Sequence, residues 1–331
     1  MKLAKIIGFV LLGIIVLIGS LITYLKLALP DVGDPEDLTI EVTSERIARG
    51  KYLANSVTVC MDCHAVRDWT KFSGPPTSGT LGKGGDVFDQ NAGLPGVYYA
   101  KNITPFGIKR YTDGELFRVI TTGVTKEGRA MFPLMPYLYY GKMDREDIYD
   151  IIAYVRSLEP VESNVPESTS DFPMNIIINT IPKPAAFVTK PDTTDQLAYG
   201  AYLVNASGCI ECHTQVDKGQ IKPELAFSGG REFGFPDGAI VRSSNITPDA
   251  ETGIGKWSRD QFIARFKEYA DSSYTPPPVA RGEFNTIMPW TMYAHMKTSD
   301  LAAIYAYMKT VKPIANTVAK FTPAPAAVAA N

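Results

Sequence analysis

The chain has 331 residues, of which 45% are hydrophobic and 21% are charged, and its formal net charge is -2. This balance is typical of a folded protein with buried cores and excludes a disordered chain. A charge so close to zero also excludes the strongly basic surface with which proteins bind nucleic acid. The length favours about two domains.

The N-terminus carries an uncharged segment of twenty residues, from 6 to 25. As a helix this segment would measure about 30 Å, enough to cross a bilayer core. Lys2 and Lys5 precede it, so the remainder of the chain is expected on the periplasmic side of a cell inner membrane. A cleaved signal peptide is the alternative, but we find no convincing Ala-x-Ala cleavage site near the end of the segment. We predict an uncleaved, single-pass anchor.

Comparison of the chain with itself indicates two similar halves. Matching segments follow one another in the same order, at offsets of 143 to 153 residues. The matches are 49–53 with 199–203, 60–64 with 209–213, 102–105 with 245–248, 111–112 with 257–258, 135–137 with 288–290, and 147–158 with 300–311. The period is too long for a solenoid, so it indicates duplication of a whole domain.

The segment between the two halves is rich in proline, which forbids a long helix and favours an extended linker. Its apolar stretch at 176–178 is expected to pack on a domain surface. We predict these boundaries: transmembrane anchor 1–29, tether 30–42, first domain 43–160, linker 161–191, second domain 192–313 and flexible tail 314–331.

The coarse pattern within each half is helical. A first helix is predicted over 44–55 and a last helix over 144–158, and the second half repeats the last helix near 300–311, with apolar residues at helical spacing. Long Gly- and Pro-rich loops separate these helices. Such loops fit better around a large rigid cofactor than around a small apolar core. We therefore predict an all-α fold.

All four cysteines lie in two Cys-x-x-Cys-His motifs. This motif attaches haem c: two thiols add covalently to the two vinyl groups of one haem, and the adjacent histidine binds the iron. Two copies therefore predict two covalently bound haem c groups. The first would be held by Cys60, Cys63 and His64, and the second by Cys209, Cys212 and His213.

Two other kinds of site also use paired cysteines. A zinc site is disfavoured because 145 residues separate the two pairs, whereas structural zinc ligands usually have short spacings. A Cys-x-x-Cys redox pair is possible in an exported protein, but it leaves the histidine after each pair unexplained. Haem attachment explains the cysteines and the histidines together.

The iron of each haem needs a sixth ligand or an open position. The third histidine of the chain, His295, aligns with Lys142 and so has no counterpart in the first half. Met135 and Met288 do align, and each is followed by proline and an aromatic residue. A thioether suits haem iron and raises its reduction potential relative to two imidazoles, although methionine is also an ordinary core residue. The predicted iron ligands are His64, Met135, His213 and Met288.

Several other positions are repeated without being chemical ligands. The repeated loops contain four hydrogen-bond donors: Asn102, Asn245, Tyr111 and Trp257. They either donate hydrogen bonds to haem propionates or fix the loop backbone. The first role is considered because buried carboxylates need hydrogen-bond partners. Gly50 and Gly200 lie in the first helix of each half. We expect them to permit a close crossing with the last helix, where an aromatic residue lies beside them.

With these residues in place, each half resembles a class I cytochrome c domain. Two segments more narrowly resemble the cytochrome c subunits of membrane-bound alcohol, aldehyde and gluconate dehydrogenases. One is 245–258, and the other is Met-Pro-Tyr at 135–137 with the Lys-Met-Asp-Arg-Glu-Asp that follows it. The resemblance covers about 44–312 and implies haem attachment and electron transfer. Those subunits typically carry three haems, a cleaved signal and a C-terminal membrane contact, and this second half has a seven-residue insertion around 276–278. No specific dehydrogenase partner is therefore implied.

The leading hypothesis is a membrane-anchored dihaem electron carrier rather than an enzyme. A quinol-oxidising complex or a periplasmic dehydrogenase would donate electrons, and a terminal oxidase or another cytochrome would accept them. A dihaem peroxidase is the alternative, but it needs one iron with an open position and both halves offer a methionine. A non-redox structural or sensing module is the third hypothesis.

Overall fold

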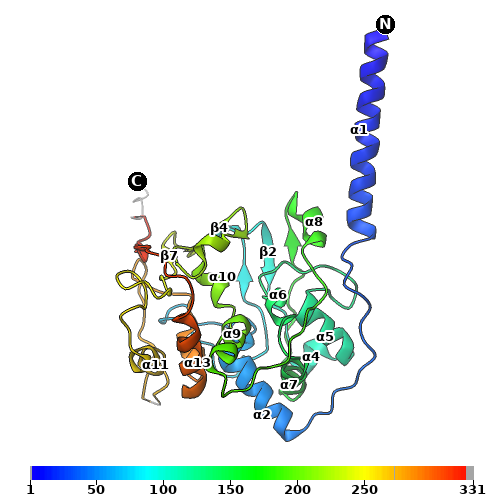
Figure 1. Cartoon of the computed structure of the whole chain (residues 1–331). Helices are drawn as coiled ribbons and strands as arrows, with labels where there is room; N and C mark the ends of the chain where they lie inside the picture. Colours follow the sequence, from blue (N-terminus) through cyan, green and yellow to red (C-terminus); the bar gives the residue numbers. More distant parts are fainter. Residues whose placement is uncertain (1, 272, 326–331) are drawn as a thin grey trace, which may run out of the picture.

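The computed structural model describes residues 2–271 and 273–325. Figure 1 shows one long helix, α1 (Lys2–Leu27), projecting from a body formed by the remainder of the chain. No residue of α1 is buried, and an 18-residue window within it has a mean hydropathy of 2.8. By length and composition it is the one helix in the described ranges that can cross a membrane. An apolar N-terminal helix is thus present where the anchor was predicted.

The body contains two successive sets of elements, which we call the first half (43–160) and the second half (192–313). Helices of the first half and linker are α2 (Ser44–Tyr52), α3 (Cys60–Cys63), α4 (Pro105–Ile108), α5 (Asp113–Thr122), α6 (Tyr137–Tyr140), α7 (Arg145–Arg156) and α8 (Met174–Ile177). Helices of the second half are α9 (Gln196–Ala206), α10 (Cys209–His213), α11 (Arg259–Lys267), α12 (Trp290–Tyr293) and α13 (Thr298–Met308). Shorter helical turns are π-helical at Leu53–Val57 and 3-10 at Gln90–Ala92, Ile178–Thr180 and Pro223–Leu225.

The predicted first and last helices are present, with small changes at their ends. The α-helix expected over 44–55 ends at Tyr52 and continues as the π-helical turn. The last helix of the first half begins after Asp144, whose side chain accepts a hydrogen bond from the Glu146 amide at 2.9 Å. Most of the apolar residues at helical spacing in this helix and in α13 are buried: Ile148, Ile151, Ile152, Val155, Leu301, Ile304 and Met308. The others, Leu158, Tyr305 and Val311, are half-buried.

The repeated pair at 111–112 and 257–258 marks the start of a helix in each half. Thr112 and Ser258 are the N-cap residues of α5 and α11, and each forms a capping box with the residue three positions later. Such a box satisfies two backbone N–H groups that the helix itself leaves without acceptors. This part of the repeat therefore encodes a helix boundary.

The first and last helices of each half cross at close range. A Cβ atom added at Gly50 in α2 would lie 1.8 Å from the Asp150 carbonyl oxygen of α7. At Gly200 in α9 it would lie 2.1 Å from the Ala303 carbonyl oxygen of α13. Only glycine fits at either crossing, as the sequence led us to expect.

Short strands add to the helices, so the fold is not purely α. In the described ranges they form three small antiparallel sheets, β1-β2-β3, β4-β5 and β6-β7-β8. The strands are β1 (Val87–Phe88), β2 (Gly96–Tyr99), β3 (Thr169–Ser170), β4 (Val216–Asp217), β5 (Gln220–Ile221), β6 (Glu232–Gly234), β7 (Ile240–Arg242) and β8 (Phe321–Thr322). Most of them lie in the long glycine-rich loops, and each pair of strands is joined over two or three residues.

The linker and the tail are more ordered than we predicted. The linker supplies β3, and its Phe187 ring stacks on Phe117 of α5 with centroids 5.1 Å apart. The apolar stretch at 176–178 forms part of α8 and the following 3-10 turn, which contact α1 and, for α8, β3. The tail supplies β8, which pairs with β7. The rest of the predicted tail, 326–331, lies outside the described residues.

A single buried hydrophobic cluster runs through both halves. It includes Leu53, Ile148 and Ile152 of the first half and Leu203 and Leu301 of the second. The halves also exchange contacts, because α6 touches α9 and α12 touches the π-helical turn after α2. The two halves therefore pack on one another through a shared core.

Candidate haem-attachment sites

Reciprocal tyrosine–aspartate hydrogen bonds join the two halves. The Tyr52 hydroxyl donates to Asp300 at 2.6 Å, and the Tyr202 hydroxyl donates to Asp147 at 2.7 Å. Tyr52 aligns with Tyr202, and Asp147 aligns with Asp300. The same contact is thus made twice, once in each direction, as in an interface between two copies related by a two-fold axis.

Each tyrosine hydroxyl also accepts a hydrogen bond at the start of the opposite last helix. The donors are the Lys297 amide, 3.0 Å from the Tyr52 oxygen, and the Asp144 amide, 3.2 Å from the Tyr202 oxygen. Burial raises the pKa of Tyr52, and the hydrogen bond to Asp300 raises it further. Burial likewise raises the pKa of Tyr202, and the charge of Asp147 adds to the effect. Both phenols stay protonated and serve as donors near neutral pH.

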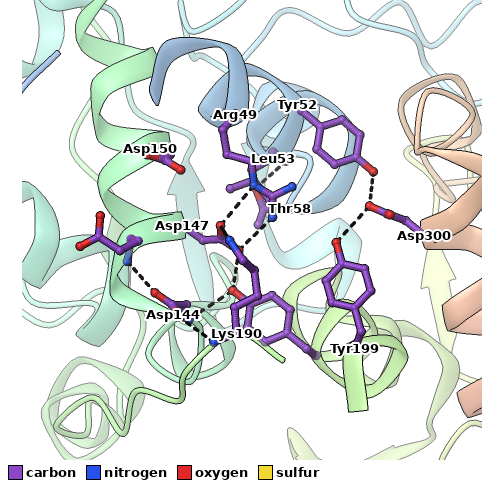
Figure 2. A network of polar contacts seen from close by, with 12 residues as sticks. Arg49, Tyr52, Leu53, Thr58, Asp144, Asp147, Asp150, Lys190, Tyr199 and Asp300 are labelled. Carbon is purple, nitrogen blue, oxygen red and sulfur yellow. Dashed lines mark hydrogen bonds and ion pairs between the residues drawn. The ribbon is translucent and has the colours of Figure 1, made fainter. Parts of the chain in front are cut away.

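The two aspartates differ in their other neighbours, as Figure 2 shows. Asp147 forms ion pairs with Arg49 at 3.1 Å and Lys190 at 3.0 Å, and its side chain is fully buried. Burial acts to raise the Asp147 pKa, but the charge and hydrogen bond of Arg49, the Tyr202 hydrogen bond and the Lys190 charge together outweigh it, so the pKa is lowered. Asp300 instead accepts from the Tyr199 hydroxyl at 3.4 Å, because position 199 replaces Arg49 with tyrosine.

The two Cys-x-x-Cys-His motifs lie on short helical turns. The residue before each turn has a left-handed backbone, with φ 45° at Val59 and 61° at Gly208. Cysteines three positions apart in a helix share one face, so each pair can reach one cofactor. None of the four cysteines is in a disulfide bond; Cys60, Cys63 and Cys209 are half-buried and Cys212 is exposed.

Both motif histidines are oriented by a backbone carbonyl. His64 Nδ1 lies 2.6 Å from the Lys101 oxygen, and His213 Nδ1 lies 2.7 Å from the aligned Ser244 oxygen. A carbonyl only accepts, so Nδ1 carries the proton and Nε2 keeps its lone pair. Burial lowers the pKa of both imidazoles despite the opposing effect of these bonds. The histidines are therefore neutral, in the form and orientation that bind a metal.

The two competing interpretations of the cysteines have little support. Burial raises the pKa of the Cys60 thiol and raises that of Cys209 to about 12, whereas reactive redox thiols have lowered pKa values. In the part of the chain that the structure describes, no three His, Cys, Asp or Glu side chains are grouped to hold a metal ion. A zinc site thus lacks its ligands there.

The methionines proposed as iron ligands lie in matching turns, which we call the Met135 turn (135–137) and the Met288 turn (288–290). Pro136 has φ -78° and ψ 50°, and Pro289 has φ -79° and ψ 65°. These values are near those of an inverse γ-turn. The amide after each proline donates to the methionine carbonyl, at 2.7 Å for Met135 and 2.8 Å for Met288.

Three of the other nearby methionines are buried, whereas Met131 is half-buried like Met135 and Met288. Met143 and Met296, which align with one another, are 0% and 1% exposed, and Met292 is also buried. Met135 and Met288 are only half-buried and lie at the edge of the core. Met143 and Met296 are thus the core-filling pair, and Met135 and Met288 remain available as ligands.

A buried tyrosine in each half joins the helix after the methionine turn to the haem motif. The Tyr140 hydroxyl donates to the Thr58 carbonyl at 3.0 Å, and the aligned Tyr293 hydroxyl donates to the Ser207 carbonyl at 2.9 Å. These carbonyls lie two residues before Cys60 and Cys209. The structure therefore brings each methionine turn close to the motif of its own half.

The Met288 turn is also held by the first half. Ser73, which is fully buried, donates its hydroxyl to the Met288 carbonyl at 2.6 Å and accepts from the Trp290 amide at 3.1 Å. The Ser73 amide donates to Asn285 Oδ1 at 2.9 Å. In the described part of the chain, the Met135 turn receives no matching hydrogen bond from the second half.

Ser73 belongs to a loop that is longer in the first half than in the second. Gly84 and Gly229 each donate an amide hydrogen bond to the carbonyl of their motif histidine, yet Gly84 is 20 positions after His64 and Gly229 only 16 after His213. The longer loop pairs with the insertion of the second half: the Phe72 amide bonds Pro277 O at 2.9 Å. The two segments that break the repeat therefore meet one another.

Arg67 connects this loop to the first haem motif. Its guanidinium forms a buried ion pair with Asp62, between the two motif cysteines, at 3.1 Å. It also donates to the Gly74 carbonyl at 3.0 Å and the Ser73 carbonyl at 3.2 Å. Sequence analysis missed Arg67 and Ser73. The available signal was that each half has extra residues beside a predicted site.

The repeated asparagines fix loops instead of facing a cofactor. Asn102 accepts from the Thr104 amide at 2.9 Å and donates to Val161 O at 2.8 Å. Asn245 accepts from the Thr247 amide at 2.9 Å and donates to Ile314 O at 2.7 Å. Of the two roles considered for these residues, the structure supports loop fixation.

Comparison with known proteins agrees with this arrangement. Residues 197–312 match the family model for cytochrome c. The chain is 27% identical to the cytochrome c subunit of alcohol dehydrogenase (quinone) from Komagataeibacter europaeus, with 86% of this chain and 60% of the relative covered. It is 28% identical to the gluconate 2-dehydrogenase cytochrome c subunit of Pantoea cypripedii (80% and 59% covered) and 26% identical to a dihaem cytochrome c-type protein of Cereibacter sphaeroides (77% and 82%).

The chain thus spans about three fifths of the length of the two dehydrogenase subunits. Cytochromes c carry covalently bound haem c through the motif found here. Residues 197–312 are therefore similar to cytochrome c, and most of the chain is similar to part of the cytochrome c subunits of alcohol and gluconate dehydrogenases.

Proposed function

We propose that this protein is a membrane-anchored dihaem cytochrome c that carries single electrons between redox partners on the periplasmic side of the inner membrane. The observation that carries this proposal is the repeated arrangement of the two motifs. In each half, two cysteines lie on one helical turn and the following histidine has its Nδ1 bonded to a carbonyl. The duplication supports two haem sites and two cytochrome domains, at 43–160 and 192–313.

The residues fit haem c at both sites. Cys60 and Cys63 would hold one haem and Cys209 and Cys212 the other, and the iron ligands would be His64 with Met135 and His213 with Met288. When bound, haem c supplies an iron that exchanges one electron between its ferric and ferrous forms. The protein contributes orientation: carbonyls fix the imidazoles, and Tyr140 and Tyr293 hold the helices that follow the methionines.

Helix α1 supports the proposed membrane location, and the relatives support the proposed partners. The lysines before the apolar stretch would keep the N-terminus in the cytoplasm and the haem domains outside. The names of the relatives support a dehydrogenase as the electron donor. A quinol-oxidising complex as donor and a terminal oxidase as acceptor are compatible with the same chemistry. The chain itself would carry electrons and catalyse no substrate reaction.

Intact-mass measurement of the protein purified from membranes tests the proposal. The wild-type chain is expected to weigh as much as its amino acids plus two haems. A variant with Cys60→Ala and Cys63→Ala should lose one haem, and the matched variant with Cys209→Ala and Cys212→Ala should lose the other. A wild-type chain with the mass of its amino acids alone, and no Soret absorbance, would refute the proposal.

A second experiment addresses the partner and the reaction class. Complexes purified with the protein should contain a dehydrogenase or respiratory complex, identified by mass spectrometry. Reduced protein should show two low-spin haems and little peroxide turnover. A five-coordinate high-spin haem with rapid peroxide turnover would favour a peroxidase instead.

A further inference from the structure

The linker contains a continuous apolar stretch with side chains exposed to solvent. No charged residue occurs between Asp171 and Lys183. Within this stretch Phe172 is 80% exposed and Ile177 is 43% exposed. The other exposed large apolar residues of the body lie outside this stretch, and single exposed apolar residues are normal on a soluble surface. Two large apolar side chains are thus exposed within one uncharged stretch.

This stretch lies against the last turns of α1, as Figure 1 shows for α8. Both α8 and the 3-10 turn after it contact α1. Ile22 and Leu25 are the two half-buried residues within α1, whose other described residues up to Leu27 are exposed. Asn179 donates its side-chain amide to the Leu25 carbonyl at 3.0 Å. The linker is therefore fixed to the end of the helix from which the body emerges.

The contact with α1 sets the depth of the linker stretch. If the uncharged segment 6–25 fills the bilayer core, Ile22 and Leu25 lie at its outer edge. Side chains packed beside them lie at the same depth. The last carbonyls of a helix have no partner within it, and inside a membrane they must be satisfied by other protein groups. Asn179 satisfies the Leu25 carbonyl at that position.

The charges beside the two apolar segments agree with this depth. Lys26 follows the uncharged segment of α1, and Lys183 follows the linker stretch. Both lysines are exposed. A lysine at the end of a membrane-inserted segment places its ammonium among the lipid headgroups while its aliphatic part stays at the boundary. The uncharged segment of α1 and the linker stretch are thus each followed by an exposed lysine of the kind found at a membrane interface.

We propose that residues 172–181 form a second membrane contact, with Phe172 and Ile177 inserted into the outer leaflet beside α1. The proposal rests on the anchoring role of α1 proposed above. A helix followed by an extended tether would leave the body free to swing. A second contact, joined to the helix by Asn179, would hold both haem domains at a fixed orientation over the bilayer.

Photo-crosslinking of the full-length protein in phospholipid nanodiscs tests this surface. p-Benzoylphenylalanine is placed at position 172 or 177, both exposed, so folding is expected to be unaffected. Position 15, in the middle of α1 and 65% exposed, is the lipid control. Position 197, at the start of α9 and 51% exposed, is the water control. Lipid adducts are detected as a gain in the intact mass.

We expect adducts at 15, 172 and 177, and none at 197. Adducts at 15 without any at 172 and 177 would overturn the second contact and leave the anchor in place. No adduct at 15 would remove the anchor and the second contact together, whereas the haem content, read from the same mass spectra, would still test the electron-transfer proposal. The adduct at 177 is also measured in two backgrounds, Phe172→Asp and Asn179→Ala. Asn179→Ala removes the hydrogen bond to the Leu25 carbonyl of α1. An adduct yield at 177 that persists in the first background and falls in the second would show that α1 positions the stretch.

Discussion

The first and second halves carry the same motif, the same histidine–carbonyl bond and the same methionine turn, yet they support the turn differently. The Met135 turn is held within its own half, whereas Ser73 of the first half bonds the Met288 turn. The interface between the halves shows a similar contrast. Asp147 forms ion pairs with Arg49 and Lys190. The side chains that donate to Asp300 in the described residues are all hydroxyl groups. A duplicated domain has thus become asymmetric where its copies meet.

Replacing the proposed methionine ligands gives the largest expected effect. Met135→Ala and Met288→Ala should each abolish the sulfur-to-iron charge-transfer band of one haem and lower the potential of that haem, because the thioether is lost. Absorption spectra and redox titration of the oxidised protein measure both effects. Met143→Leu and Met296→Leu are the matched controls and should keep both bands. Persistence of both bands in both alanine variants would show that the ligand assignment is wrong.

The aligned aspartates provide a direct comparison of the two sides of the interface. Asp147→Asn leaves Arg49 without its buried partner and should cost about 3–5 kcal/mol in the free energy of unfolding. Asp300→Asn keeps an acceptor for the tyrosine hydroxyls and should cost about 1–2 kcal/mol. Urea unfolding monitored by circular dichroism gives both values. A larger loss for Asp300→Asn would contradict the role assigned to the two cations.

The same pair predicts a pH dependence. The Asp147 pKa is lowered in the folded protein, so its contribution is present above the unfolded pKa of about 3.9 and is lost as the pH falls through the folded value. Wild type should therefore lose stability on acidification below about pH 5, and Asp147→Asn should lose less over the same interval. Unfolding curves at a series of pH values measure the difference. Equal pH slopes in the two proteins would exclude this linkage.

The helix crossings test how closely the scaffold is duplicated. Gly50→Ala and Gly200→Ala both place a Cβ too near a backbone carbonyl, and each should destabilise the fold by about 3 kcal/mol through overpacking. Lys51→Ala, at an exposed position of the same helix as Gly50, should change stability by less than about 0.5 kcal/mol. Thermal unfolding of the three variants makes the comparison. A tolerated alanine at only one crossing would show that the two halves pack differently there.

The local features of the sites were predictable from sequence, and the contacts between halves were not. The Cys-x-x-Cys-His motifs, the methionine turns and the last helices leave signals within a few residues. Ser73 and Met288 are 215 positions apart, and no local pattern reports a bond of that range. Likewise, the helical pattern of α7 predicts that Asp147 lies near buried residues but not that Tyr202 reaches it.

The strands and the tail were missed for a related reason. A strand of two residues has no periodicity, so β3 and β8 were assigned to a linker and a flexible tail. Pairing with β2 and β7 orders them, and that pairing depends on the position of a distant segment. The departures from the repeat were visible, but their lengths alone did not indicate that the longer loop of the first half contacts the insertion of the second.

Ser73→Ala gives the smallest expected effect and tests the asymmetry most directly. It removes the donor to the Met288 carbonyl and one of the two acceptors of the Trp290 amide, whose bond to the Met288 carbonyl remains, at a cost of about 0.5–1.5 kcal/mol. Because the Met135 turn has no such support in the described ranges, only one of the two charge-transfer bands should weaken, and it should be lost at a lower temperature than in wild type. Ser78→Ala, an exposed serine of the same loop, is the control. If both bands weaken together, Ser73 stabilises the whole fold and does not position Met288.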